Sequence, residues 1–232
     1  MQFSTILHKA TLIKRYKRFL ADVKLVDGAI VTAHCPNTGS MESCFFEGCT
    51  VWLSPSSNPE RKLKWTWEFS EIQEGLVGIN TAIPNAVVAE AIKNGEIPEF
   101  SGYQSLRREV KYGKNSRIDI LLESKGKPPC YIEIKNTTLR RNDGILFPDA
   151  VTERGRKHLE ELSQLAMAGQ RAVMLFFVNR PDGSYFAPAD DIDPQYGLAL
   201  RSAEAAGVEI IARRAQATPK GIGIGPAIPI RL

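Results

Sequence analysis

Apolar and polar residues alternate with a period of two in several short stretches of the first third of the chain, which is typical of strands with one buried face. Residues 19–25 alternate in this way, and Asp27-Gly28 then indicates a hairpin turn before the run A-I-V-T-A-H. Three more strand-like runs follow, C-T-V-W-L-S, L-K-W-T-W-E-F-S and L-V-G-I-N. A small barrel buries about five such strands without exposed edges, so we predict an OB-like β-barrel over residues 1–83, with a small open sandwich as the alternative.

The pattern changes near residue 84, where helix-like and strand-like periods begin to alternate. A connector over residues 83–100 contains a helix that is predicted to start at Pro84 and to stop at Gly95. The runs L-R-R-E-V-K-Y, R-I-D-I-L-L and C-Y-I-E-I-K then predict three strands. The last two flank Lys125-Gly126-Lys127, which favours a hairpin.

A long amphipathic helix is predicted next, with its apolar positions largely on one face: Val151, Leu159, Leu162, Leu165 and Ala166. The run R-A-V-M-L-F-F-V predicts a strand covered on both faces, so strand, helix and strand form a βαβ unit with parallel strands. A second helix near 195–206, the strand V-E-I-I-A and a Gly- and Pro-rich tail that adds an edge strand complete the chain. We therefore predict an α/β domain with a mixed sheet over residues 84–232, and an α+β protein overall.

Composition narrows the class of protein only slightly. The net charge of +4 and pI of about 8.9 permit nucleic-acid binding without requiring it. The start of the chain has no signal-peptide pattern, and no apolar run approaches the roughly 20 residues of a membrane span, so we expect a cytoplasmic protein with no membrane partner. The four cysteines form no C-x-x-C pair, which favours reduced thiols over disulfides or zinc.

Three charged residues stand on the two strands of the predicted hairpin: Asp119, Glu133 and Lys135. Side chains alternate between the faces of a strand, so Glu133 and Lys135 share a face, and Asp119 shares its face with Arg117 and Leu121. Carboxylate oxygens suit Mg²⁺ or Mn²⁺, and a nearby lysine can orient water or stabilise a phosphorane-like transition state. The alternative is a solvated sheet face with a surface ion pair, and E-x-K alone is common enough to favour it.

Longer patterns resemble a known family, the sugar fermentation stimulation protein A family. They are H-C-P-N-T-G-S-M, P-N-A-V-V-A-E-A-I, S-R-I-D-I-L-L, Y-I-E-I-K-N-T-T-L and F-P-D-A-V-T-E-R-G-R-K-H-L-E-E-L, and they run nearly end to end. The resemblance implies an N-terminal OB-fold, a C-terminal domain of the PD-(D/E)XK nuclease type, DNA binding, a regulatory role in maltose metabolism and a suspected nuclease activity. Asp119, Glu133 and Lys135 match the motif's acid, acid and lysine, whereas Ile118 replaces its proline.

Glu109 is a further metal-ligand candidate, ten residues before Asp119 on the preceding predicted strand. The resemblance implies it, because nucleases of this type often recruit an additional upstream acid. A surface pairing with Arg107 or Lys111 is the alternative.

The segment from Asp149 to His158 combines a helix start with many charges. Asp149 and Thr152 suit a helix N-terminus, and Gly155 inside the helix indicates close approach by another element or by a ligand. The resemblance places this helix beside the metal site, where it implies phosphate contacts from three basic residues, Arg154, Arg156 and Lys157. His158 fits a buried structural role as well as a catalytic one.

Basic residues also gather near the N-terminus and form a candidate nucleic-acid surface: Lys14, Arg15, Lys17 and Arg18. Arg117 is a candidate for the same function beside Asp119. A solvated edge that prevents sheet aggregation is the alternative. Trp65, Trp67 and Phe69 form one row on a strand and are expected in the core, and the stretch N-T-G-S near residue 37 is expected to be a loop.

The functional hypothesis is a DNA-binding protein with Mg²⁺- or Mn²⁺-dependent phosphodiester hydrolysis. Asp119, Glu133 and Glu109 would hold the metal, and Lys135 would act on water or the phosphate. RNA is a second candidate partner, and a dimer is compatible with the sequence. The alternatives are a DNA-binding regulator without catalysis and a metabolic protein whose charged strand face is structural.

Overall fold

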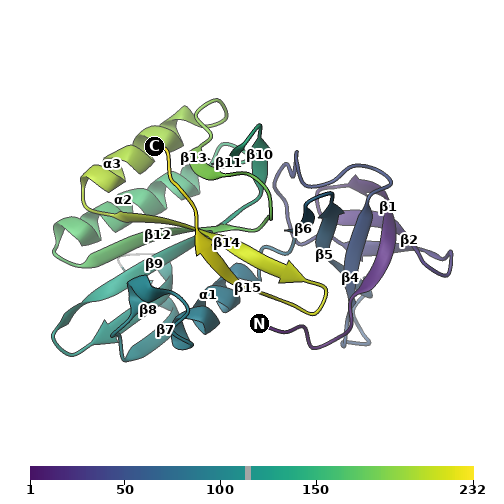
Figure 1. Ribbon diagram of the computed structural model, residues 1–232, viewed down its shortest axis with the longest axis horizontal. Coiled ribbons are helices and arrows are strands. Elements are labelled where there is room, and N and C mark those ends of the chain that lie inside the picture. The colour runs from purple at the N-terminus through teal and green to yellow at the C-terminus, as the bar shows by residue number, and fades with distance from the viewer. Residues whose placement is uncertain (113–115) are drawn as a thin grey trace.

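The computed structural model describes residues 1–112 and 116–232. A β-barrel and a larger α/β part lie side by side (Figure 1). The barrel contains six strands: β1 (His8–Tyr16), β2 (Leu20–Leu25), β3 (Ile30–His34), β4 (Thr50–Pro55), β5 (Trp65–Ile72) and β6 (Gly75–Gly78). Their order is β3-β2-β1-β4-β5-β6, and a parallel pairing of β3 with β5 closes the first five into a ring. The prediction of an OB-like barrel is confirmed, but β1 was missed.

Strand β1 escaped prediction because its sequence, HKATLIKRY, carries basic residues on its outward face. Only Ala10 and Leu12 of this strand are buried, so its apolar face is short. β1 nevertheless pairs with both β2 and β4 and is needed to close the ring, whereas β6 extends the sheet beyond it.

The aromatic row predicted on β5 is wrong at Phe69. The register of β4 and β5 shifts between Trp52 and Leu53, so that Trp52 is opposite Phe69 and Leu53 is opposite Trp67. Trp67 is fully buried inside the barrel, but Phe69 belongs to the core of the α/β part and packs edge-on against Phe3. Because of this irregularity, β5 contributes Trp67 to the barrel core and Phe69 to the core of the neighbouring α/β part.

The α/β part is built on a six-stranded mixed sheet in the order β15-β14-β12-β9-β8-β7. Its strands are β7 (Ser105–Tyr112), β8 (Ser116–Ser124), β9 (Lys127–Thr137), β12 (Arg171–Val178), β14 (Glu209–Thr218) and β15 (Gly221–Ala227). A smaller sheet contains β10 (Leu139–Arg141), β11 (Gly144–Phe147) and β13 (Tyr185–Pro188). The helices are α1 (Pro84–Lys93), the 3₁₀ turn η1 (Pro98–Phe100), α2 (Glu153–Met167) and α3 (Pro194–Ala205).

Helices cover both faces of the main sheet (Figure 1). Along β12, Val173, Leu175 and Phe177 face the core that contains α1, whereas Met174 and Phe176 face the core beneath α2 and α3. This alternation confirms the prediction of a strand buried on both faces. Strands β9 and β12 are parallel and joined by α2, and β15 forms the predicted edge strand on β14.

Helix α2 begins one residue after Thr152, whose hydroxyl accepts a hydrogen bond from the Gly155 N–H. The prediction that Val151 lies on the apolar face of this helix is wrong, because Val151 precedes the helix and is 67% exposed. At Gly155 a Cβ would lie 2.7 Å from Thr152 Cγ2 and 3.1 Å from the ring of Tyr196 on α3, so these side chains would have to shift to admit it. Of the two alternatives for this glycine, close packing by another element is therefore observed.

The two parts are fastened together by the buried guanidinium of Arg180. It donates to Asp182 of its own domain at 2.8 Å and to the Ser43 hydroxyl of the barrel at 2.9 Å. The N-terminus adds a second connection, since the amino group of Met1 donates to the Ile222 carbonyl of β15. These contacts fix the barrel against the sheet.

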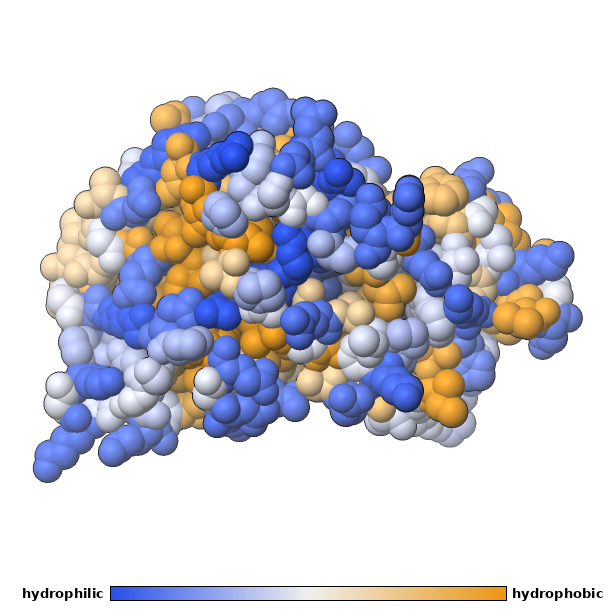
Figure 2. All heavy atoms as spheres, in the orientation of Figure 1, coloured by the Kyte–Doolittle hydropathy of each residue, from blue (hydrophilic) through white to orange (hydrophobic). Residues whose placement is uncertain are grey.

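Apolar side chains on the barrel form separate patches among hydrophilic residues in the face shown in Figure 2. Among the described residues, no helix has the length and apolar composition needed to cross a membrane.

Candidate functional site

The site forms where strands β8 and β9 diverge. Their pairing includes Ile120 with Ile132 but does not extend to Asp119. Instead, the Asp119 carboxylate accepts a hydrogen bond from the Ile134 N–H at 2.7 Å, in place of a backbone carbonyl. The two strands can therefore separate here because the Asp119 side chain satisfies the Ile134 N–H, which would otherwise be unpaired.

The regular alternation predicted for β8 fails at this point. Ile120 lies in the core beneath α1 as expected for its face, but Ile118 lies in the opposite core, together with Leu121. The face assignment is therefore wrong at Ile118. The switch occurs across Asp119, which is the residue that leaves the ladder.

Glu109 lies at the same level on β7, because Arg108 pairs with Ile120 and Val110 with Ile118. It adopts a left-handed backbone conformation with φ of 53°, which non-glycine residues rarely occupy without a compensating role. Arg107, its predicted alternative partner, instead donates to Glu123 at 2.8 Å. The structure thus brings Glu109 to the pocket that also contains Asp119.

Glu133 and Lys135 extend from β9 toward α2, as their shared face predicts. Lys135 Nζ lies 2.7 Å from Glu133 Oε1 and 3.2 Å from His158 Nδ1. The His158 ring also contacts the same carboxylate oxygen of Glu133. His158 is therefore part of the site, and its i,i+4 spacing from Arg154 on the same helix was the available signal.

Burial and neighbouring charge perturb the two carboxylates in opposite directions. Burial, together with the negative charge of Glu133, raises the pKa of Asp119 to about 6. Burial by itself would raise the pKa of Glu133 too, but the hydrogen bond from His158 and the charge of Lys135 hold that pKa below its usual value. The pair therefore combines one carboxyl group with a raised pKa and one with a lowered pKa, and perturbed pKa values of this kind are common at functional sites.

A pocket of about 470 Å³, which we call the charged pocket, is lined by Glu109, Arg117, Asp119, Glu133, Arg154, Lys157 and His158. Lys135 is not one of these lining residues, but its Nζ lies 2.7 Å from Glu133 Oε1. Of the basic residues predicted on α2, Arg154 and Lys157 reach this pocket. Arg156 does not, because it binds the buried carboxylate of Asp193, with both oxygens at 3.1 Å.

The donor set of the charged pocket fits a hard divalent cation. Glu133 Oε2 is buried and has no hydrogen-bond partner among the residues that the structure describes, although the other oxygen of this carboxylate has two. Such an atom is costly unless a ligand satisfies it. Within residues 1–112 and 116–232, no three Asp, Glu, His or Cys side chains are already arranged as a metal site, so binding would require a small rearrangement of Glu109 or water ligands.

Asn85 was not identified from the sequence. It stands in the first turn of α1, and its amide donates to Asp119 Oδ1 at 2.7 Å. A lone asparagine 34 residues before its partner carries no local pattern, so only the packing of α1 beside the diverging strands could reveal it.

The basic N-terminal cluster lies on β1 and in the turn that follows it. Arg15 is occupied by the barrel itself, since it donates to the Asn37 and Gly39 carbonyls at 3.0 and 2.9 Å. Lys14 lies 3.7 Å from Asp22. Lys17 and Arg18 are exposed and have left-handed backbone conformations in the turn, so they remain available to solvent or a ligand.

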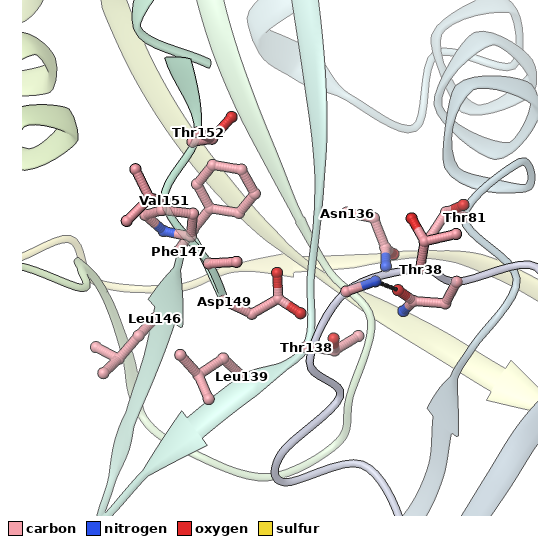
Figure 3. A pocket seen from close by; sticks show the side chains of 14 residues that line it. Thr38, Thr81, Asn136, Thr138, Leu139, Leu146, Phe147, Asp149, Val151 and Thr152 are labelled. Atoms are coloured by element: carbon pink, nitrogen blue, oxygen red, sulfur yellow. Dashed lines mark hydrogen bonds between the residues drawn. The ribbon is translucent and has the colours of Figure 1, made fainter. Parts of the chain in front are cut away.

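A second pocket, which we call the interdomain pocket, lies where the barrel meets the α/β part (Figure 3). It measures about 330 Å³. The N-T-G-S stretch is a loop, as predicted, and forms one side of it. The other side comes from the end of β9, the small sheet and the segment before α2.

A closed five-stranded barrel followed by a helix-covered mixed sheet with an acid-acid-lysine set defines a two-part α+β protein of the OB-fold and nuclease-like class. Comparison with known proteins agrees with both halves. Residues 13–79 match the SfsA N-terminal OB domain, and residues 82–221 match the sugar fermentation stimulation protein RE domain. The chain belongs to the sugar fermentation stimulation protein family.

Similar proteins extend over the whole chain. A sugar fermentation stimulation protein homolog of Paramagnetospirillum magneticum is 53% identical over 232 residues, covering 100% of this chain and 98% of the relative. One from Acidithiobacillus ferrooxidans is 54% identical and covers 97% of each. The solved structure of Pyrococcus furiosus SfsA in complex with Ca²⁺ has a TM-score of 0.89 at 27% identity, covering 100% of this chain and 98% of that one.

Proposed function

We propose that this protein binds DNA and hydrolyses phosphodiester bonds in the charged pocket with a divalent metal ion, Mg²⁺ or Mn²⁺. Residues 1–83 would serve as the binding barrel and residues 84–232 as the nuclease-like domain. The observation that carries the proposal is the buried Glu133 Oε2 beside Asp119, which no described residue satisfies, because it offers a carboxylate oxygen to a cation at little further desolvation cost. The complex of Pyrococcus furiosus SfsA with Ca²⁺ supports divalent-cation binding in the family.

Asp119, Glu133 and Glu109 would hold the cation, whose chemical contribution would be to neutralise phosphate charge and to acidify water. Asn85 and the Ile134 N–H fix the orientation of Asp119 by holding one oxygen each. Lys135 Nζ, held between Glu133 and His158, would donate a hydrogen bond to the attacking water or to a phosphoryl oxygen.

Basic side chains would guide the nucleic-acid backbone to these acids. Arg117, Arg154 and Lys157 line the charged pocket, and Lys17 and Arg18 lie exposed on the barrel. Phosphate contacts of this kind fix the register of the backbone and make affinity depend on salt. The same chemistry would accept RNA, so both polymers belong in the first assay.

The test is cleavage of single-stranded, duplex and branched DNA and of RNA by purified protein with Mg²⁺ or Mn²⁺. Asp119→Asn, which keeps the shape and removes the charge, is expected to lower the rate at least about 1,000-fold, the order expected when a metal's several kcal/mol is lost. Asp191→Asn, an exposed acid outside the pocket, is the matched control and is expected to keep full activity. No cleavage of any substrate by the wild type would refute the proposal.

DNA binding without cleavage is a second candidate, because the acids are already compensated by the chain's own groups. Asp119 accepts two hydrogen bonds, and Glu133 Oε1 contacts both Lys135 and His158. A regulator of this kind would bind DNA equally well with chelator or with Mn²⁺, and Asp119→Asn would leave its affinity unchanged. Calorimetric titration of Mn²⁺ into wild type and Asp119→Asn distinguishes the two functions.

A further inference from the structure

The interdomain pocket differs from its surroundings in having almost no charge. Fourteen of the described residues line it, and Asp149 is the only ionisable one among these fourteen. Its volume of about 330 Å³ falls within the range of small-ligand sites. The absence of lysine and arginine from this lining makes it a poor place for a phosphate and a suitable one for a neutral group.

Two unlike walls face each other across the pocket (Figure 3). One wall is apolar and consists of Leu139, Leu146, Phe147 and Val151. The other carries small amide and hydroxyl side chains, Thr38, Thr81, Asn136 and Thr138. The Asp149 carboxylate lies between the walls. A flat group could rest on the apolar wall while its polar edge meets donors and acceptors opposite.

The polar wall is held in place before any ligand arrives. Arg15 binds the carbonyls of Asn37 and Gly39, and the Asn37 side chain accepts from the Gly39 N–H at 2.9 Å. Asp149 lies 3.4 Å from the Ser40 hydroxyl. A Cβ at Gly39 would displace the Asp149 carboxylate from its present position against the loop. The role that the structure gives Arg15 is thus to support the pocket.

The interdomain pocket adjoins the charged pocket along the chain. Glu133 lines one and Asn136 the other, but these two residues of β9 lie on opposite faces of the main sheet, because Glu133 pairs with Met174 and Asn136 with Phe177, which belong to opposite cores. On α2, Arg154 borders the charged pocket and the N-cap Thr152 borders the interdomain pocket. The two pockets are therefore connected by the start of α2, so a polymer with a phosphate beside Arg154 can place a neighbouring residue between the domains.

We propose that the interdomain pocket binds one unpaired nucleobase of the nucleic acid whose phosphate lies in the charged pocket. The inference rests on the proposed function. A base has the required flat face for the apolar wall and a hydrogen-bonding edge for the amides and hydroxyls, while Asp149 accepts from a base N–H. The base must be unpaired, because its edge and its faces are free only outside the duplex stack.

The experiment measures binding in chelator, so that no cleavage occurs. A labelled single strand of about 12 nucleotides, within the site sizes usual for such proteins, and a strand of equal length built entirely of abasic residues are titrated with wild type, Asp149→Asn and Val151→Asn. Wild type is expected to bind the normal strand about 5- to 150-fold more tightly, the effect typical of one stacked base. Both variants should reduce the ratio of the affinity for the normal strand to the affinity for the abasic strand at least about threefold. The affinity for the abasic strand should stay unchanged.

Met167→Asn is the matched control, because Met167 is 70% exposed at the far end of α2 and should keep the wild-type ratio. Unchanged unfolding midpoints establish that the variants are folded. A ratio unaffected by Asp149→Asn and Val151→Asn overturns the inference, and so does equal weakening of both strands, which would indicate backbone contacts. Failure of cleavage with an intact ratio would refute the nuclease proposal and leave the base site supported, whereas wild type that binds neither strand overturns both.

Discussion

The charged pocket and the interdomain pocket border the same strand, β9, yet they have opposite chemistry. All seven side chains that line the charged pocket are ionisable, against one of fourteen in the interdomain pocket. The charged pocket forms inside one domain, where two strands diverge, whereas the interdomain pocket exists only because the barrel is fixed against the sheet. The difference shows how a single strand can border one pocket lined by ionisable side chains and another that is nearly uncharged.

Arg180→Ala should have the largest effect, and it loosens only the interdomain pocket. It removes the Arg180 guanidinium from the buried Asp182, which retains Arg140 as a partner, and it breaks the bond to Ser43, so we expect a loss of up to about 3–5 kcal/mol in the free energy of unfolding. Urea denaturation measures it. Arg201→Ala breaks an exposed pair with Asp190 at 2.6 Å and should cost about 0–1 kcal/mol. Equal costs would show that Arg180 does not fasten the domains.

Lys135→Ala examines the charged pocket alone. Because the Lys135 side chain is only 14% exposed and lies between Glu133 and His158, its loss should lower the cleavage rate about 100- to 1,000-fold with little change in DNA affinity. Lys157→Ala is the control, since this exposed lysine lies 3.7 Å from Glu161 and would contribute only to phosphate binding. Single-turnover rates separate the two effects, and similar rates for both variants would contradict a special role for Lys135.

The pH dependence of stability should reveal the raised pKa of Asp119. The folded protein binds this proton up to about pH 6, against an ordinary value of 3.8, so the stabilisation is complete below about pH 4 and lost as pH rises through 6. In chelator, the stability of wild type relative to Asp119→Asn should fall by about 3 kcal/mol between about pH 4 and 7. Denaturation at several pH values measures it. A flat difference would contradict the buried carboxylate pair.

Adding Mn²⁺ at about pH 7 should restore much of that lost stability in the wild type, because a ligand that binds only the folded state stabilises it. Asp119→Asn is expected to respond much less. Equal responses would place the cation elsewhere.

The smallest expected effect is a difference in DNA affinity between substitutions at two arginines of α2, Arg154 and Arg156. Arg154→Ala should weaken DNA binding severalfold and reduce the slope of log affinity against log salt by about 1, because Arg154 borders the charged pocket. Arg156→Ala should leave that slope unchanged, since its guanidinium is held by Asp193. Anisotropy titrations over a series of salt concentrations measure both slopes. The same slope change in both would contradict the assignment of Arg156 to the helix junction.

The sequence by itself determined the secondary structure where periodicity was strong. The β9–α2–β12 unit, the doubly buried β12 and the hairpin of β2 and β3 follow from local alternation of apolar residues, which depends only on neighbours in the chain. The positions of Glu133 and Lys135 on one face follow for the same reason. Strand β1 was missed because its outward basic residues conceal a short apolar face.

Only the tertiary structure decided how the site is assembled. The departure of Asp119 from the ladder, the left-handed conformation of Glu109 and the support from Asn85 depend on strands that diverge under a packed helix. Arg15 and Arg156 look in the sequence like phosphate ligands, but each is held in a structural contact by a buried residue far along the chain, Asn37 for Arg15 and Asp193 for Arg156. A charge pattern gives the type of chemistry available, while long-range packing determines which charges remain free to perform it.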